Sequence, residues 1–165
     1  MLKSRNIYLW ILLICTCAVG YSLYAQYQLG FHPCPLCIAQ RVIIILIGMV
    51  ALISYWINPK SVGCRIIGVI ITIIAGFAIK VALHHMWLMD LPKYQQPQSC
   101  GMPLSVLYDK LSTISFLKTI LNGDAECALV HWKIFGFISP PAGVIIIASI
   151  IIYLSLYLIF RRYRD

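Results

Sequence analysis

Four long stretches of the chain are apolar on every side, and the polar residues gather between them. The apolar runs cover residues 7–26, 38–57, 62–83 and 142–160. A helix needs roughly 20 apolar residues to cross a hydrocarbon core of about 30 Å, whereas the helices of a water-soluble core are shorter and amphipathic. The pattern therefore predicts an all-α fold, a polytopic membrane protein built as one four-helix transmembrane bundle from residues 1–165.

Composition agrees with this pattern. Hydrophobic residues make up 61% of the 165 positions, charged residues only 11%, and the mean hydropathy is +0.89, which excludes an ordinary water-soluble domain. We interpret the first run as a retained anchor, because it is longer than the apolar core of a signal peptide and no clear cleavage site surrounds Ala25.

The net charge of +8 indicates topology and does not indicate nucleic-acid binding. Basic residues precede the first run, lie between the second and third, and follow the fourth, whereas the 86–139 segment carries equal numbers of acidic and basic residues. Under the positive-inside rule both termini and the 58–65 turn are cytoplasmic. The basic residues concerned are Lys3, Arg5, Lys60, Arg65, Arg161, Arg162 and Arg164.

Two loops then face the other side of the membrane, over residues 27–37 and 86–139. The longer loop contains leucine and isoleucine residues at spacings of three and four between 104 and 121. This stretch is too polar to cross a bilayer, so we expect a short amphipathic helix that lies on the outer membrane surface.

A C-x-x-C pair, Cys34 and Cys37, stands where the first of these loops ends and the second run begins. Pro35 suits the first turn of a helix, and Arg41 follows Cys37 by one turn on the same helix face. Thiols at a helix start exchange readily because the helix dipole stabilises a thiolate. Arg41 either reaches the nearby headgroups or supports a thiolate or ligand.

The predicted topology sorts the seven cysteines. Cys100 and Cys127 lie on the same outer side as the C-x-x-C pair, whereas we assign Cys15, Cys17 and Cys64 no redox role. A structural role explains the C-x-x-C pair poorly. A disulfide between these two cysteines closes a very short loop, so it constrains the unfolded chain little and adds little stability. A four-thiolate metal site would normally use two close pairs. A non-enzymatic membrane protein with structural disulfides or a cysteine-bound metal remains the alternative.

Several short motifs accompany the four spans: Cys34-Pro35-Leu36-Cys37 with Ile38-Ala39-Gln40-Arg41; His85-Met86-Trp87-Leu88; Cys100; Gly123-Asp124-Ala125-Glu126-Cys127; Trp132; Phe135-Gly136-Phe137; and Pro140. In this combination the chain resembles the DsbB family of bacterial inner-membrane, quinone-linked disulfide oxidoreductases over nearly its whole length. Vitamin K epoxide reductase-like proteins are the nearest rival, but there the C-x-x-C follows the other cysteine pair.

The resemblance implies an enzyme that re-oxidises a periplasmic thioredoxin-like oxidase of the DsbA type and passes the electrons to membrane quinone, ubiquinone or menaquinone. It implies that Cys100 forms the mixed disulfide with the partner and that Cys127 passes electrons to the Cys34–Cys37 disulfide. Cys37 would meet the quinone, with Arg41 and His85 lining the quinone pocket. Lys80 and His84 receive no role from the family.

Overall fold

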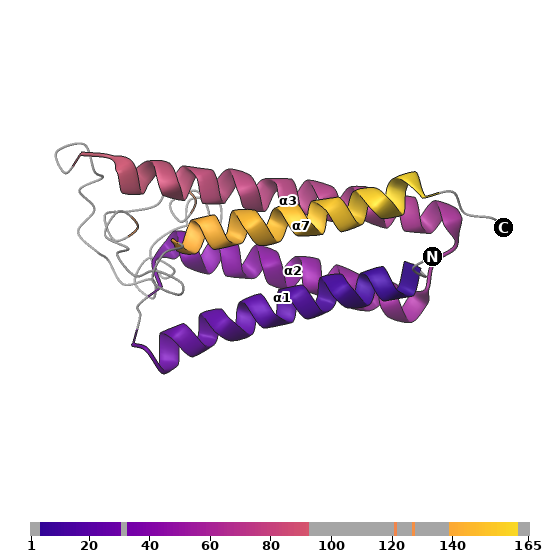
Figure 1. Cartoon of the computed structure of the whole chain (residues 1–165), viewed down its shortest axis with the longest axis horizontal. Helices are drawn as coiled ribbons and strands as arrows, with labels where there is room; N and C mark the ends of the chain where they lie inside the picture. The colour runs from indigo at the N-terminus through magenta and orange to yellow at the C-terminus, as the bar shows by residue number, and fades with distance from the viewer. Residues whose placement is uncertain (1–3, 31–32, 93–120, 122–126, 128–138, 162–165) are drawn as a thin grey trace, which may run out of the picture.

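The computed structural model describes residues 4–30, 33–92, 121, 127 and 139–161. This part of the chain forms four helices: α1 (Ser4–Tyr27), α2 (Pro35–Ile57), α3 (Ser61–Asp90) and α7 (Pro140–Phe160) (Figure 1). All four are long and apolar enough to cross a membrane. The predicted all-α, four-helix bundle is confirmed, and each predicted span lies within one of these helices.

Local sequence sets where the helices begin and end. Pro35 and Pro140 occupy first turns, where a missing N–H costs no hydrogen bond. Asn58 ends α2 in the left-handed conformation, with φ 45°, and its N–H donates to Ser54 O at 3.0 Å. Asparagine tolerates this conformation better than most residues. The short turn before Ser61 therefore reverses the chain directly into α3.

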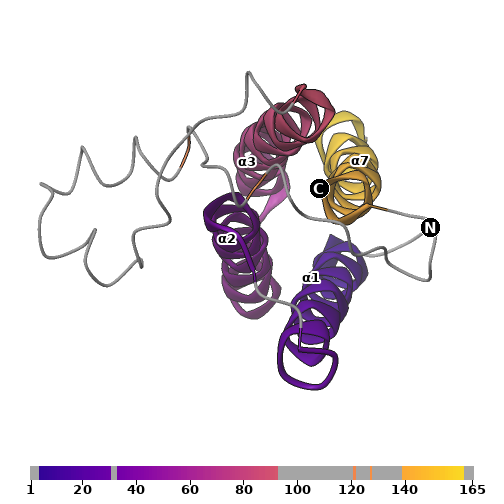
Figure 2. The ribbon, with the colours of Figure 1, turned by 90° about the vertical axis from the view of Figure 1, so that its left-hand side faces the viewer.

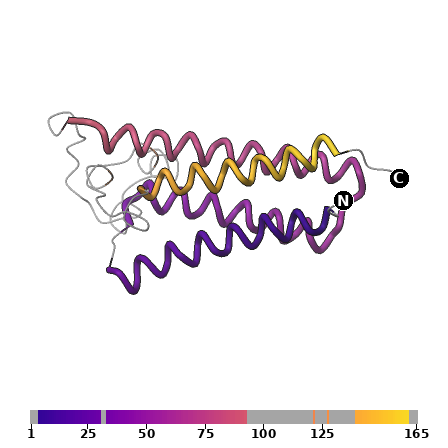
Figure 3. Tube along the Cα trace, viewed as in Figure 1, coloured from indigo at the N-terminus to yellow at the C-terminus, as the bar shows by residue number. Residues whose placement is uncertain are grey.

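The helices run alternately up and down, so both termini lie at one end with the α2–α3 turn (Figure 1). Viewed along the bundle, the order around it is α1, α2, α3 and α7 (Figure 2). The largest contact is between α3 and α7, and the next is between α1 and α2. The tube view shows α1 diverging from α7 towards the end that carries Tyr27 (Figure 3).

Small residues allow close packing where the helices touch. A side chain at Gly68 of α3 would meet Ile159 Cγ1 at 2.8 Å and Ser155 O of α7 at 3.1 Å. Thr72 Oγ1 and Ser155 Oγ also form a hydrogen bond of 2.7 Å across this interface. Close approach of backbones and hydroxyl hydrogen bonds are typical of helix pairs in membranes.

The outside of the bundle is apolar. Trp56, Tyr153 and Phe160 expose more than 70% of their surface. Such a surface suits lipid, since a large contiguous apolar patch is rare on a soluble monomer.

Two of the expectations concern the long outer loop that follows α3. The extent of the outer segment from residue 86 stays a prediction, and its first residues are helical because α3 continues to Asp90. A helix does not have to end where the bilayer does: 30 residues span about 45 Å, more than the hydrocarbon thickness. The amphipathic helix expected at 104–121 lies outside the described residues apart from Leu121, which packs against the core.

Candidate active site

The C-x-x-C pair forms the start of α2. Cys34 is the N-cap residue, with extended backbone (φ −71°, ψ 164°), and its Sγ accepts a hydrogen bond from the Cys37 N–H at 3.3 Å. The two Sγ atoms lie 2.9 Å apart. The helix start thus holds both sulfurs within reach of a disulfide, because capping by Cys34 and the first turn fix their relative position.

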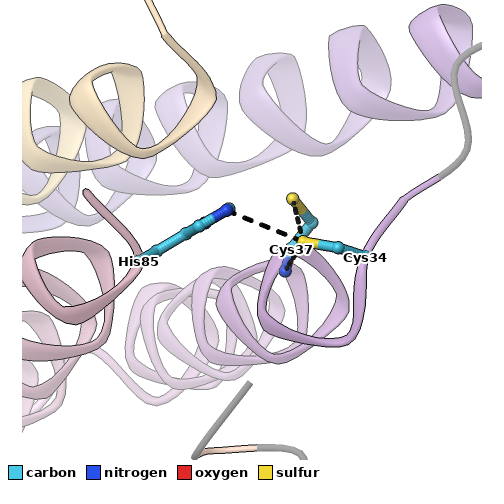
Figure 4. A group of neighbouring side chains, drawn as sticks. All are labelled: Cys34, Cys37 and His85. Atoms are coloured by element: carbon cyan, nitrogen blue, oxygen red, sulfur yellow. Dashed lines mark hydrogen bonds between the residues drawn. The ribbon is translucent and has the colours of Figure 1, made fainter. Parts of the chain in front are cut away.

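Cys34 is the buried member of the pair. It is 2% exposed, and His85 on α3 points its Nε2 atom at the Cys34 Sγ from 3.7 Å (Figure 4). The same Nε2 atom lies 3.2 Å from the backbone oxygen of Cys127. Cys127 is fully buried, and its side chain is hydrogen-bonded to that of Cys34. The structure therefore brings Cys34, Cys127 and His85 together from three parts of the chain.

Gln40 holds the other edge of the imidazole. Its Nε2 lies 3.5 Å from His85 Nδ1, and both side chains are buried. An amide N–H donates, so Nδ1 is the accepting nitrogen and the proton of neutral His85 sits on Nε2. That proton faces the Cys127 carbonyl oxygen and the Cys34 sulfur, so one tautomer satisfies the contacts on both edges of the ring.

The thiol of Cys34 is held in its protonated form. Hydrogen bonds to the side chains of Cys127 and Cys37, followed by burial, raise its pKa above the ordinary value of 9.0. Burial without a compensating positive charge disfavours a thiolate. Where one member of the pair carries the thiolate, we therefore assign that charge to Cys37.

Arg41 connects α2 to α1. Its Nε and Nη2 donate to Ser22 Oγ at 3.0 and 2.7 Å, and its Nη1 donates to Gln26 Oε1 at 2.8 Å. A guanidinium inside a membrane span is costly without such partners. The sequence prediction left open whether Arg41 reaches the headgroups. In the structure Arg41 stays between the helices, because α1 supplies oxygen acceptors.

A pocket of about 740 Å³ opens between α1, α2 and α7. Its walls are mainly apolar side chains from α1 and α7, and its polar groups gather where α2 begins. Apolar side chains in the walls include Leu13, Ile14, Val144 and Ile147, and the polar end includes Ser22, Gln26, Cys37, Gln40 and Arg41. Ligand sites commonly combine an apolar cavity of this size with a few polar groups.

The predicted site residues are thus partly brought together. Cys34, Cys37 and Cys127 adjoin one another, and Arg41 shares the pocket wall with Cys37. His85 is not part of that wall. It packs against Cys34, which is hydrogen-bonded to Cys127, and its place in a quinone pocket stays a prediction. Cys100 lies outside the described residues.

Sequence reasoning missed three contributors: Ser22, Gln26 and Gln40. Ser22 and Gln26 are four residues apart near the end of an apolar helix, a spacing that puts both on one face. Gln40 follows Cys37 by three residues and shares its face of α2. Polar residues at helical spacing near a charged residue inside a span are the signal that could have found them.

The comparison with protein families decides the assignment. Residues 4–158 match the family described as "Disulfide bond formation protein DsbB". The chain belongs to the DsbB family. It is 35% identical over 163 residues to "Disulfide bond formation protein B" of Chromobacterium violaceum, covering 99% of this chain and 97% of that protein. With the protein of the same name from Acinetobacter baylyi it shares 37% identity over 155 residues, 92% of this chain and 90% of that protein.

No solved structure matches the chain. A DsbB-family member with four spanning helices is a multi-pass membrane protein and a thiol–disulfide oxidoreductase. The resemblance read from the motifs is therefore confirmed, as is the prediction of an enzyme. The alternative, a non-enzymatic membrane protein with structural disulfides or a cysteine-bound metal, is wrong in that the chain belongs to an enzyme family.

Proposed function

We propose that this DsbB-family protein re-oxidises a periplasmic dithiol oxidase of the DsbA type and delivers the electrons to membrane quinone. The observation that carries the proposal is the placement of the Cys34–Cys37 pair. Cys34 adjoins buried Cys127, whereas Cys37 lines the apolar pocket. One pair of sulfurs thus faces a thiol of the long loop on one side and a membrane ligand on the other.

The transfer proceeds by thiol–disulfide exchange. A thiolate of the partner attacks Cys100 of a Cys100–Cys127 disulfide, and Cys127 leaves as a thiolate. Cys127 then attacks Cys34 of the Cys34–Cys37 disulfide, and Cys37 leaves. The partner's second thiolate releases Cys100, which attacks Cys127 and frees Cys34. The partner ends oxidised, and Cys34 and Cys37 carry its two electrons as thiols.

His85 positions the second of these steps. Its Nε2–H donates to the Cys127 carbonyl at 3.2 Å and points at the Cys34 sulfur at 3.7 Å. It therefore holds Cys127 beside the sulfur that it attacks. When Cys34 is later released as a thiolate, the same N–H is the nearest described proton donor from α3. Gln40 fixes the tautomer that this role needs.

The pocket fits a quinone. A quinone has an apolar ring and tail with carbonyl oxygens that accept hydrogen bonds, and the pocket has apolar walls with Arg41 and Gln40 at its polar end. When bound, ubiquinone or menaquinone supplies an acceptor for two electrons and two protons. Arg41 would orient a carbonyl oxygen and stabilise negative charge there and on Cys37, and the apolar walls exclude water.

The orientation of the chain in the membrane follows from the positions of its basic residues. Arg5 precedes the body of α1, and Lys60 and Arg65 mark the α2–α3 turn at the same end of the bundle (Figure 1). The positive-inside rule then puts both termini in the cytoplasm and the cysteine pair at the periplasmic face of the bacterial inner membrane. This is the compartment in which disulfides persist.

The first test is a turnover assay. Purified protein is mixed with a reduced DsbA-type partner and a short-chain quinone, and quinone reduction is followed by absorbance. We expect turnover with the intact chain and none with Cys37→Ser, while Cys64→Ser at the cytoplasmic end retains it. Turnover that survives Cys37→Ser would overturn the proposed electron path.

The order of the relay is tested by trapping. In Cys127→Ser the Cys100 sulfur has no disulfide partner and is a thiol, so the protein is mixed with the oxidised partner. The Cys100 thiolate should then attack the partner's disulfide, release one partner thiol and form a mixed disulfide that no Cys127 thiolate can resolve. Mass spectrometry of the non-reduced adduct identifies the cysteine. An adduct at Cys34 would reverse the assigned roles.

The pocket is tested by filling it. Ala18 lines the pocket, so Ala18→Phe should raise the KM for quinone without changing exchange with the partner. Thr16→Phe is the matched control, because Thr16 is an exposed residue of the same helix and does not line the pocket. Equal effects of the two substitutions would place the quinone elsewhere.

A further inference from the structure

Three side chains that commonly bind metals converge at the start of α2. The Sγ atoms of Cys34 and Cys37 and the Nε2 atom of His85 all lie within 4.8 Å of one another (Figure 4). Around a tetrahedral zinc ion, bonds of about 2.3 Å to sulfur and 2.0 Å to nitrogen put neighbouring ligand atoms roughly 3.5–3.8 Å apart. The observed 3.7 Å from the Cys34 sulfur to the His85 nitrogen fits this spacing, whereas the 2.9 Å between the two sulfurs is shorter and has to widen when a cation binds.

We propose that the reduced form of this site binds one thiophilic divalent cation, such as zinc or cadmium, through Cys34, Cys37 and His85. The site is distinct from a four-cysteine metal centre, because its third ligand is a histidine from α3. A fourth ligand comes from water. Small rotations of the three side chains bring their donor atoms to metal distance.

Binding depends on the redox state of the cysteine pair. Two thiols bind the cation by releasing two protons, so two thiolates and one divalent ion form a neutral set, and no electrons move. A Cys34–Cys37 disulfide offers no thiolate and does not bind. Neutrality matters here because Cys34 and His85 are buried, and an uncompensated charge at such a position is costly.

Gln40 supports the imidazole of His85 from the edge that faces away from the sulfurs. In the metal-free site Gln40 donates to Nδ1, so the proton of His85 is on Nε2. A metal on Nε2 requires the proton on Nδ1, and a half-turn of the Gln40 amide then presents Oε1 as its acceptor. Such partners orient a metal-binding histidine, and removing one typically weakens affinity by about 10- to 100-fold.

The cation competes with Cys127 for His85. The Nε2 atom that would bind the metal is the atom that contacts the Cys127 backbone oxygen at 3.2 Å. Metal binding therefore breaks this contact and also occupies both sulfurs of the pair. If the proposed relay operates, the cation inhibits it by trapping the dithiol form. This consequence rests on the proposed function, whereas binding itself does not.

Direct metal titration tests the proposal. The full chain is used with Cys15, Cys17, Cys64 and Cys100 replaced by alanine, so that the remaining thiols are those of the site and Cys127. Cadmium is added to the reduced and to the oxidised protein, and the sulfur-to-cadmium charge-transfer absorption is recorded. We expect one cadmium per chain in the reduced form and none in the oxidised form. This comparison needs no substitution within the site.

Variants identify the ligands. His85→Ala should weaken cadmium binding by at least the 10- to 100-fold typical of losing a supporting group, and Gln40→Leu should weaken it within that range. His84→Ala is the matched control, since His84 is adjacent in sequence but stacks on Trp87. X-ray absorption of the zinc-loaded protein should show sulfur neighbours at about 2.3 Å and a nitrogen neighbour at about 2.0 Å.

Three results would overturn the site. They are equal binding by reduced and oxidised protein, an unchanged affinity in His85→Ala, and a zinc spectrum with sulfur neighbours but no nitrogen. Inhibition of turnover is measured separately with the unmodified chain. Binding without inhibition would leave the metal site intact and would count against the proposed relay instead.

Discussion

Arg41 of α2 donates to the hydroxyl oxygen of Ser22 on α1, with a distance of 2.7 Å from Nη2 and 3.0 Å from Nε. One small side chain thus accepts two hydrogen bonds from the guanidinium at the polar end of the pocket. Gln26 accepts a third at 2.8 Å. The orientation of Arg41 towards a ligand is therefore set by α1, the helix that diverges most from the bundle.

Replacing Ser22 by alanine should weaken quinone use. A hydrogen bond to a charged group contributes about 1.5–3 kcal/mol, and 1.4 kcal/mol corresponds to tenfold, so we expect the KM for quinone to rise about tenfold. Steady-state kinetics at varied quinone measures it. Thr16→Ala on the same helix is the control, because the Thr16 hydroxyl donates to the Leu12 carbonyl of its own helix. A fall in the partner-exchange rate, with KM unchanged, would contradict the role given to Ser22.

Replacing His85 by alanine should affect a different step. The loss of the Nε2–H contact with Cys127 leaves the sulfur of Cys34 without its positioned partner. We expect kcat to fall about 100-fold, the lower end of the range for a positioned proton donor, while the KM for quinone stays unchanged. Stopped-flow measurement of electron transfer from the reduced partner isolates the step.

The control for His85 is His84→Ala, which removes a neighbouring ring that stacks on Trp87. His85→Gln keeps a side-chain donor and should recover part of the rate. If both His85 variants instead raised the KM for quinone, the residue would belong to the pocket, as the sequence first suggested.

The four helices and the place of the cysteine pair could be predicted from the sequence, because both depend on residues that are close together along the chain. The four spans follow from uninterrupted apolar runs, and the start of α2 follows from Pro35 beside the cysteine pair. Contacts across helices do not follow in the same way. The contact of Arg41 with Ser22 and the contact of His85 with Cys34 depend on how α1 and α3 rotate against α2.

Helix ends were also harder to predict than helix centres. The apolar run of α3 ends near residue 83, but the helix continues to Asp90 through a mixture of polar and apolar residues. A helix that packs against its neighbours does not have to end where the hydrocarbon ends. His85 belongs to this continuation, so an accurate end for α3 would have placed it on a rigid element opposite Cys34.

Packing between α3 and α7 gives a prediction on stability. Gly68→Ala adds a Cβ at 2.8 Å from Ile159 Cγ1 and 3.1 Å from the Ser155 backbone oxygen. Overpacking of this kind costs about 1–3 kcal/mol, so thermal unfolding in detergent should occur at a lower temperature. Gly76→Ala on the same helix is the control, since nothing lies within 4 Å of its added Cβ. Equal effects of the two substitutions would mean that helix propensity, and not packing, sets the result.

The two thiols of the C-x-x-C pair should differ in reactivity. Cys34 is 2% exposed, and its hydrogen bonds to Cys127 and Cys37 raise its pKa above 9.0. Each unit of that rise lowers the thiolate fraction about tenfold. In the reduced protein we therefore expect maleimide to modify Cys37, which faces the pocket, well before Cys34 at pH 7. Mass spectrometry of the modified peptides measures both rates.

The same shift predicts how the stability of the reduced protein depends on pH. A thiol whose pKa is higher in the folded than in the unfolded chain stabilises the fold below the unfolded value, and that contribution is lost as pH rises above it. The free energy of unfolding should therefore fall as pH increases beyond 9.0, and Cys34→Ala should reduce this dependence because it removes the titrating group. Cys17→Ala, at an exposed thiol of α1, should leave the dependence unchanged. A pH dependence that persists in full without Cys34 would assign it to another group and remove the case for a protonated Cys34 beside a Cys37 thiolate.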